Sequence, residues 1–446
     1  MTMNVHEGTV RRPAATRRAG RLAVAGVAVI ALAACGGGTE AGGGDGEDDG
    51  GTVTLQFIHP EVAGSFDPLI EAYEASHPGV RIEATNVPFD QLQSTLQSRL
   101  SQGDSSIDVY TVDPSRIPGI VAREQLLDIS DLMDQAEEAT IPSSLEPNVV
   151  DGKLWSLPIW TSEQYLYYNP TLLEQAGITP PSKDPAQRWT WEQVVEAARQ
   201  AQAAGAEHGL LIEQINRYYQ LQPLAESLGG GPGLSGDDLL TPDLTNDGWV
   251  RAMTWFRDIH ESGVAPRGIA PDQMGPLFAA GKAAFYVGGP WVIPGWKAEN
   301  AAFGIAPHPY FADGEPATPT DSWSWGISPH SEHVEEAKEF LEWAALTTEG
   351  SLATIEKIFI PPTNAEAFDE YMGRLDASVP GVTEGAGDLM LHELENTAVH
   401  RPPSLGYIQF EEMMVNVFED IRNGSDPEER LSKAEEELES AFSRLR

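Results

Sequence analysis

From residue 52 onward the chain repeats one hydrophobic pattern, in which a short apolar run is followed by an amphipathic stretch and then by another apolar run. Residues 53–58, 107–112 and 283–287 are apolar runs of strand length, and apolar side chains recur at helical spacing over residues 89–100. Strands that alternate with amphipathic helices are typical of βαβ units. The pattern predicts an α/β fold with a parallel sheet that helices cover on both faces.

Local signals place one helix start in this pattern. Thr190 and Gln193 have the spacing of a capping box, which predicts a helix over residues 191–203. The neighbouring Trp189 and Trp191 then belong to the helix start rather than to a binding site.

The N-terminus has the three parts of a bacterial signal peptide, residues 1–34. Arginines precede an apolar run of about 11 residues, which is too short for a membrane-spanning helix because such a helix needs about 20. The cleavage site at residues 32–36, Leu-Ala-Ala-Cys-Gly, resembles the bacterial lipobox, whose cysteine receives a diacylglyceryl group and becomes the new N-terminus. Cys35 is the only cysteine, so an intrachain disulfide is excluded and a lipid anchor is expected. Export by the general secretory route is favoured, with the twin-arginine route as the alternative.

Length and composition divide the remainder of the chain. Residues 35–51 consist almost entirely of Gly, Asp and Glu, which predicts a flexible tether behind the lipidated cysteine. Residues 52–446 are too many for one compact domain of ordinary size and predict two domains with separate cores.

Charge and missing motifs exclude several classes of function. The chain has 28 basic and 68 acidic side chains and a net charge of −40, so it repels nucleic acid and anionic lipid headgroups. The sequence contains no P-loop, no nucleotide-binding glycine fingerprint after a strand and no Gly-x-Ser-x-Gly motif. Its ten histidines lack metal-ligand spacing. We therefore expect neither a cofactor nor a metal.

Eight short segments, in their order and spacing, resemble the extracellular solute-binding proteins of ABC importers that carry sugars and glycerol phosphodiesters, a family that includes maltose-binding protein. They are residues 108–113 (DVYTVD), 126–129 (LLDI), 151–158 (DGKLWSLP), 166–170 (LYYNP), 189–192 (WTWE), 278–284 (FAAGKAA), 288–291 (GGPW) and 323–327 (WSWGI). The resemblance implies a periplasmic-binding-protein-like fold of two α/β lobes, joined by a three-segment hinge with the ligand cleft between them. Crossings are expected near residues 161, 321 and 361, with residues 52–161 and 322–361 in lobe 1 and residues 162–321 and 362–446 in lobe 2.

The candidate ligand contacts lie mainly at strand ends, because open α/β sheets bind ligands beyond the carboxyl ends of their strands. They are His59, Asp113, Trp160, Glu163, Trp291, Asp321, Trp323 and Tyr407. Trp291 follows the strand over residues 283–287, and the resemblance implies an aromatic platform there, since a flat indole suits the apolar face of a pyranose ring. Core packing is the alternative for each aromatic candidate.

The acidic candidates carry alternatives of their own. Asp113 offers charge-assisted hydrogen bonds to sugar hydroxyls, but followed by Pro114 it also suits a helix N-cap. The family commonly has a carboxylate one residue before Glu163, where this chain has Ser162. Asp321 stands where many members have glycine. Either Glu163 has taken that role or the register differs here, and because of the departure at Asp321 the ligands of the best-known members are not carried over to this chain.

The resemblance implies a monomeric binding protein and not an enzyme. Such a protein captures a sugar or oligosaccharide at the outer face of the cell membrane and delivers it to ABC permease subunits. The alternatives are a glycerophosphodiester ligand, a secreted glycoside hydrolase, whose cleft would also hold tryptophans and paired carboxylates, and a sensor or adhesin. Because a phosphate recruits Arg or Lys, the absence of a basic cluster among the candidates favours a neutral sugar.

Overall fold

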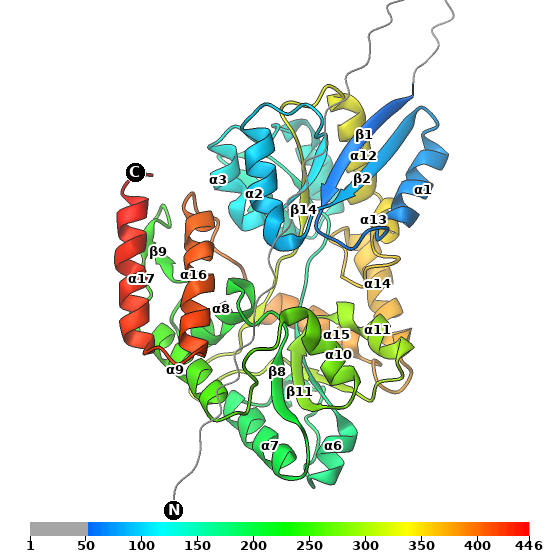
Figure 1. Cartoon of the computed structure of the whole chain (residues 1–446). Coiled ribbons are helices and arrows are strands. Elements are labelled where there is room, and N and C mark those ends of the chain that lie inside the picture. Colours follow the sequence, from blue (N-terminus) through cyan, green and yellow to red (C-terminus); the bar gives the residue numbers. More distant parts are fainter. Residues whose placement is uncertain (1–51, 446) are drawn as a thin grey trace, which may run out of the picture. The chain divides into compact units, whose positions relative to one another are not determined.

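The computed structural model describes residues 52–445; the signal peptide, the tether and the lipidation site predicted at Cys35 lie outside the described residues. The described chain forms two α/β lobes, each built on its own sheet, with β1 and β14 in one and β8 and β11 in the other (Figure 1). No described helix has both the length and the apolar composition needed to cross a bilayer.

The sheet of the first lobe has the strand order β2-β1-β3-β14-β6. β1 (Val53–His59) lies parallel to β2 (Val80–Asn86) and to β3 (Val109–Val112). β14 (Ser324–Ile327) runs antiparallel to β3 and to β6 (Leu157–Pro158). The helices around this sheet are α1 (Asp67–Ser76), α2 (Phe89–Leu100), α3 (Ile117–Val121), α4 (Met133–Ala139), α5 (Pro142–Leu145), α12 (Val334–Leu346) and α13 (Thr348–Thr354).

The sheet of the second lobe has the order β12-β7-β11-β8. β11 (Ala283–Gly288) is parallel to β8 (His208–Ile212), whereas β7 (Tyr165–Tyr168) is antiparallel to both β11 and β12 (Gly304–Pro307). The remaining helices are α6 (Pro170–Gln175), α7 (Trp191–Ala203), α8 (Tyr218–Ser227), α9 (Asp247–Glu261), α10 (Pro271–Ala279), α11 (Ile293–Ala298), α14 (Ala365–Ser378), α15 (Ala386–Asn396), α16 (Tyr407–Arg422) and α17 (Pro427–Phe442).

Short elements complete the described chain. Three two-stranded sheets pair β4 (Val149–Val150) with β5 (Lys153–Leu154), β9 (Leu234–Ser235) with β10 (Thr241–Pro242) and β13 (Thr318–Pro319) with β15 (Ala398–Val399). The 3₁₀ turns are η1 (Pro114–Arg116), η2 (Ser130–Leu132), η3 (Glu146–Asn148), η4 (Pro185–Gln187) and η5 (Pro290–Val292).

Both main sheets are mixed, so the predicted parallel sheet is wrong in this respect. The cause is the connection between the lobes. β7 enters the second sheet directly after the first crossing and β14 re-enters the first sheet after the second crossing, so each runs against its neighbours. The local predictions fared better: α7 has the expected bounds, and Thr190 and Gln193 form both hydrogen bonds of the capping box, at 2.8 and 3.3 Å.

Three chain segments lie side by side where the lobes join. The amide of Thr161 donates to the carbonyl of Pro361 at 2.9 Å, and the amide of Ile159 donates to the carbonyl of Trp323 at 3.0 Å. The hydroxyls of Thr161 and Thr320 lie 3.3 Å apart. These contacts confirm the three-segment hinge that the resemblance implied.

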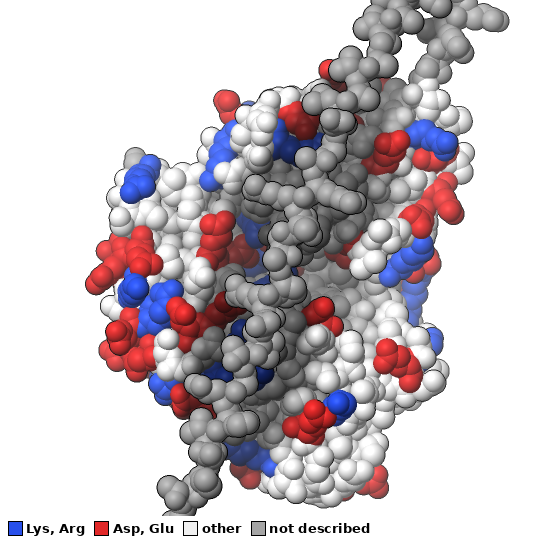
Figure 2. All heavy atoms as spheres, viewed as in Figure 1, with Lys and Arg blue, Asp and Glu red and all other residues white. Residues whose placement is uncertain are grey.

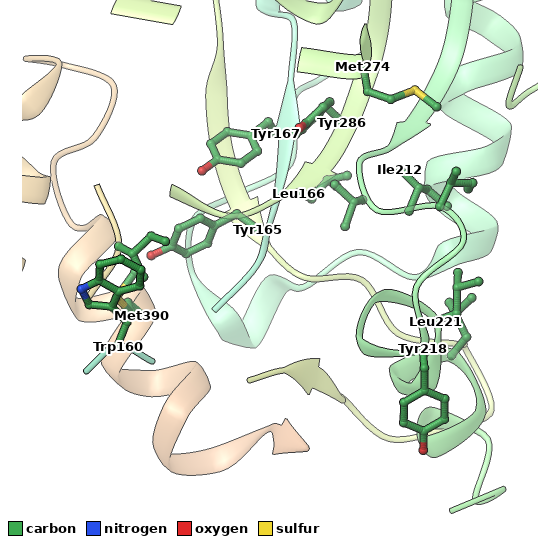
Figure 3. Close-up of a cluster of buried hydrophobic side chains, with 14 of the residues drawn as sticks. Trp160, Tyr165, Leu166, Tyr167, Ile212, Tyr218, Leu221, Met274, Tyr286 and Met390 are labelled. Carbon is green, nitrogen blue, oxygen red and sulfur yellow. The ribbon is translucent and has the colours of Figure 1, made fainter. Parts of the chain in front are cut away.

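Aromatic side chains dominate the core beside the hinge (Figure 3). Tyr165 and Tyr167 on β7 are fully buried, and their hydroxyls donate to the carbonyls of Ala386 and Gly289. Such bonds remove the cost of burying a phenol. Most charged side chains lie on the surface, and acidic ones gather where α17 forms the left edge of Figure 2.

Candidate functional site

A cleft of about 390 Å³ lies between the lobes, beside the hinge. Its walls come from the loop after β1, the starts of α2, η1, α8 and α10, the loop after β8, η5, the hinge, the segment after α13, and α16 with the segment that leads into it. The lining residues are Pro60, Glu61, Phe89, Asp113, Ser162, Glu213, Gln214, Arg217, Tyr219, Pro271, Asp272, Trp291, Asp321, Ser322, Trp323, Ile358, Ile360, Arg401 and Glu411. Four candidates from the sequence, Asp113, Trp291, Asp321 and Trp323, are among them.

The other four candidates do not line the cleft, because each is buried behind it. His59 packs between Phe57 and Phe66, and burial lowers its pKa to about 4. Trp160 stacks on Phe66, and its indole N–H donates to the Thr354 hydroxyl at 2.9 Å. Core packing, the stated alternative, describes Trp160.

Glu163 and Tyr407 are fully buried. Burial raises the pKa of Glu163 well above its ordinary value, and the carboxylates of Glu393 and Asp321 raise it further, whereas a hydrogen bond with Thr320 opposes the shift. Tyr407 packs against Tyr218, and its hydroxyl donates to Glu411 at 3.4 Å. Tyr407 therefore supports a cleft residue instead of facing the cleft.

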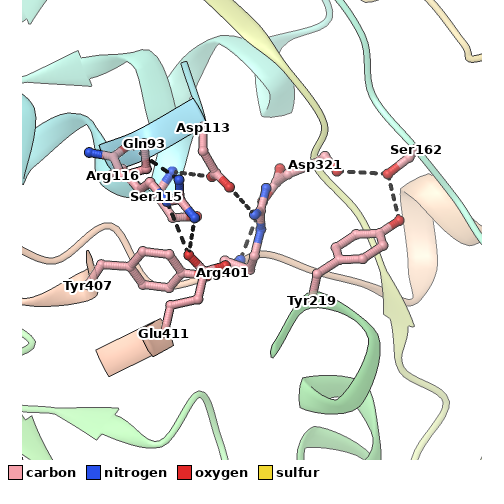
Figure 4. A network of polar contacts seen from close by, with 10 residues as sticks. All are labelled: Gln93, Asp113, Ser115, Arg116, Ser162, Tyr219, Asp321, Arg401, Tyr407 and Glu411. Carbon is pink, nitrogen blue, oxygen red and sulfur yellow. Dashed lines mark hydrogen bonds and ion pairs between the residues drawn. The ribbon is translucent and has the colours of Figure 1, made fainter. Parts of the chain in front are cut away.

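Asp113 combines both roles that the sequence left open. One carboxylate oxygen accepts the backbone N–H of Ser115 at 3.2 Å, which makes Asp113 the N-cap of η1. The other accepts Nη1 of Arg401 at 2.5 Å (Figure 4). Because Arg401 follows Asp113 by 288 residues, no local pattern reveals the pair.

A second ion pair joins the lobes next to the first. The guanidinium of Arg116 in η1 donates to Glu411 of α16, with a distance of 3.1 Å from Nε, and to Gln93 at 3.3 Å (Figure 4). The guanidinium of Arg217 lies over the ring of Phe89, 3.2 Å from its centre. Charged contacts therefore span the cleft at this end.

The expectation that no basic cluster accompanies the candidates is wrong, since Arg116, Arg217 and Arg401 gather here. Asp113 neutralises Arg401, and Glu411 neutralises Arg116. Arg217 forms no ion pair within the described chain, and burial lowers its pKa to about 10, which leaves it charged at neutral pH. One cation without a carboxylate partner thus faces the cleft.

Asp321 has φ of +74°, in the left-handed region that favours glycine. Glycine, which the resemblance implied at this position, would adopt this conformation without strain. In this chain the Asp321 carboxylate bonds to Nδ1 of His400 at 2.7 Å and to the backbone N–H of Arg401 at 3.3 Å. These bonds compensate for the strained backbone and tie the second crossing to the segment before α16.

Two tryptophans face the cleft, each half-buried. Trp291 of η5 donates its indole N–H to the Glu213 carboxylate, and Trp323 of the hinge packs against Phe89 with ring centres 5.2 Å apart. Burial raises the pKa of Glu61 and of Glu213 to about 7. The cleft therefore combines aromatic faces with acceptors and donors, an arrangement that suits a polyhydroxylated ligand.

Sequence reasoning missed Glu213, Arg217, Tyr219, Arg401 and Glu411. A signal for Glu213 existed, because it directly follows the apolar run of β8, as Asp113 follows β3. The arginines and Glu411 carry no local signal. No group of three or more His, Cys, Asp or Glu residues within residues 52–445 has the geometry to hold a metal ion.

Comparisons with known proteins fit this geometry. The model of the family "Bacterial extracellular solute-binding protein" matches residues 59–349, which is more than half of the chain. The maltodextrin-binding protein of Bacillus subtilis (strain 168) is 30% identical over 245 residues, which cover 53% of this chain and 56% of that protein. The galactooligosaccharide-binding protein of the same strain is 22% identical over 337 residues, which cover 74% and 77%.

A solved structure supports the fold. The ABC substrate-binding protein of Listeria monocytogenes in complex with cycloalternan has a TM-score of 0.76 and 18% identity, covering 88% of this chain and 99% of that one. These relatives are binding proteins, which confirms the expectation of a binding protein over a glycoside hydrolase. The chain therefore belongs to the family of bacterial extracellular solute-binding proteins.

Proposed function

We propose that this protein is a lipid-anchored receptor that encloses a sugar or oligosaccharide between its lobes and delivers it to the permease of an ABC importer. The observation that carries the proposal is the pair of tryptophans, Trp291 from the second lobe and Trp323 from the hinge, that face one cleft lined by carboxylates. Indole faces bind the C–H face of a pyranose, and carboxylates accept its hydroxyls. The oligosaccharides in the names of two relatives support this class of ligand.

The lobes in this proposal comprise residues 52–161 with 322–361, and residues 162–321 with 362–446. Asp113, Trp291, Asp321 and Trp323 contact the ligand, and hinge motion closes the lobes around it. Small-angle scattering with and without ligand tests closure, since a smaller particle is expected at saturation. An unchanged radius of gyration would contradict the hinge motion.

A thermal-shift panel identifies the ligand. It contains maltose, maltotriose, galactobiose, mannitol and glycerophosphocholine. A ligand at a hundred times its Kd adds about 2.7 kcal/mol to the free energy of unfolding. We expect a shift with at least one of the sugars. If only glycerophosphocholine shifts the melting temperature, the sugar proposal fails, and a phosphodiester bound at Arg217 becomes the proposed ligand. The structural support for this alternative ligand is the guanidinium of Arg217, which lies over the Phe89 ring and stays charged without an ion-pair partner among the described residues.

The anchor is tested separately. Cys35→Ser removes the acylated thiol, so the protein should remain unprocessed or appear in the soluble fraction, whereas the unchanged protein should sediment with membranes. Equal membrane association of the two forms would contradict the anchor.

A further inference from the structure

Glu213 and Trp291 come from neighbouring parallel strands of the second lobe. Glu213 directly follows β8, and its backbone N–H donates to the carbonyl of Val287 on β11 at 3.0 Å. Trp291 lies in η5, which begins two residues after β11 ends. Both side chains therefore start at the carboxyl edge of the sheet, which borders the cleft.

The indole ring is fixed on one face and at one edge. Its N–H lies 2.9 and 3.0 Å from the two carboxylate oxygens of Glu213. A Cβ added to Gly289 would lie 2.0 Å from the Trp291 ring, and one added to Gly288 would lie 2.7 Å from a Glu213 oxygen. Neither glycine has positive φ, so the Gly-Gly pair is needed for space and not for backbone freedom. The remaining face of the ring is the one left for a ligand.

The Glu213 carboxylate keeps capacity for a further donor. A carboxylate has about four acceptor positions. Three donor groups lie against this one, namely the Trp291 indole, the Tyr286 hydroxyl and the backbone N–H of Gly289, which leaves about one position for a further donor. No ion pair within residues 52–445 involves Glu213. It lines the cleft beside Trp291. A pyranose stacked on the indole presents its C–H bonds to the ring face and its equatorial hydroxyls at the ring edge, where this carboxylate lies.

We propose that Glu213 is the positioning residue of the Trp291 platform and that its carboxylate also accepts one hydroxyl of the sugar ring stacked there. The inference rests on the proposed function for its ligand. The pair then selects a pyranose with a free hydroxyl at that edge, because a deoxy or O-methyl analogue leaves a buried acceptor without its donor.

The ionisation of Glu213 makes the contact with Trp291 measurable as a function of pH. Burial raises the pKa of Glu213 to about 7, so its charged form, the better acceptor, is lost as pH falls through that value. The groups facing it are Tyr286 on β11, Tyr167 on β7 and Arg217. Burial raises the pKa of both tyrosines well above the ordinary value, and Arg217 stays charged. Glu213 is thus the group of this set that titrates near neutral pH.

The positioning role is tested without ligand by ¹⁹F NMR on protein labelled with 5-fluorotryptophan. The resonance that is missing from Trp291→Phe identifies Trp291. In the unchanged protein it should shift with a midpoint near pH 7. In Glu213→Gln, whose amide oxygen can still accept the indole N–H, the resonance should persist but not titrate. An unaltered titration in Glu213→Gln would overturn the positioning role.

Two controls isolate the effect. Glu226→Gln changes a carboxyl of α8 whose pKa burial also raises and which lies outside the cleft, so the Trp291 midpoint should not move. The resonance of Trp296, whose indole donates to the Gly275 carbonyl at 3.1 Å, should stay constant with pH.

The hydroxyl contact is tested by calorimetry with the panel sugar that binds most tightly. At pH 8, Glu213→Gln should weaken binding roughly ten- to a hundredfold, since hydrogen bonds to charged groups are the stronger ones. One deoxy analogue of that sugar should lose affinity for the unchanged protein but not for Glu213→Gln. Affinity within twofold of the unchanged protein would overturn the contact. If no panel sugar binds the unchanged protein, the proposed function and this contact fail together, while the NMR titration still decides the positioning role.

Discussion

Replacing Arg401 with Met should destabilise the protein by breaking the ion pair with Asp113. Both side chains are almost inaccessible, with exposures of 7% and 3%. The substitution roughly preserves volume but leaves the Asp113 carboxylate with one bond, from the Ser115 N–H. Removing one partner of a buried pair costs about 3–5 kcal/mol. Since Asp113 keeps one hydrogen-bond donor, we expect Arg401→Met to lower the free energy of unfolding by about 3 kcal/mol, the lower end of that range.

The corresponding change in melting temperature follows from the size of the protein. A folded chain of about 400 residues has an unfolding entropy of about 0.8 kcal/mol per kelvin, so 3 kcal/mol lowers Tm by about 4 °C. Asp113→Asn should have a similar effect, because asparagine retains the N-cap but leaves the guanidinium without its carboxylate. The double variant buries no unpaired charge, so its loss in free energy of unfolding should be clearly smaller than the sum of the losses in the two single variants.

Differential scanning calorimetry at pH 7 on the four proteins measures this coupling. Arg374→Met is the control, since Arg374 pairs with Glu370 on the exposed surface and should change Tm by less than 1 °C. Additive losses in the double variant would refute the assignment of a coupled buried pair.

Three further outcomes are expected. Trp291→Ala removes the platform face, and stacking plus lost burial should weaken sugar binding roughly tenfold to several-hundredfold; near-unchanged affinity in calorimetry together with a large fall in Tm would assign the ring to the core. Gly289→Ala should displace that ring and weaken binding, whereas Gly275→Ala, whose added Cβ would meet nothing closer than 3.8 Å, should bind normally. The Asp321 carboxylate raises the pKa of His400, so the free energy of unfolding that this pair contributes is complete below about pH 6.5 and is lost as pH rises through the raised value. The Tm difference between the unchanged protein and His400→Gln should therefore be larger at pH 6 than at pH 9. A Tm difference that does not depend on pH would contradict the pair.

The sequence by itself determined the elements and the edge at which a site could form. Hydrophobic periodicity gave the βαβ order, the capping box at Thr190 gave the start of α7, and the strand ends gave Asp113 and Trp291 as cleft residues. These features depend on neighbours within a few residues, and short-range patterns record such contacts directly.

Only the tertiary structure decided which side chains face the cleft and how they are paired. Trp160 and Trp323 lie on adjacent hinge segments, yet one packs on Phe66 in the core and the other lines the cleft. The residues around Asp113 indicate an N-cap, whereas the residue that neutralises its charge, Arg401, lies 288 residues further along the chain. Burial and ion pairing are set by contacts between segments that are distant in the chain. The periodicity of a single sequence reports only neighbours within a few residues, so it does not reveal these contacts.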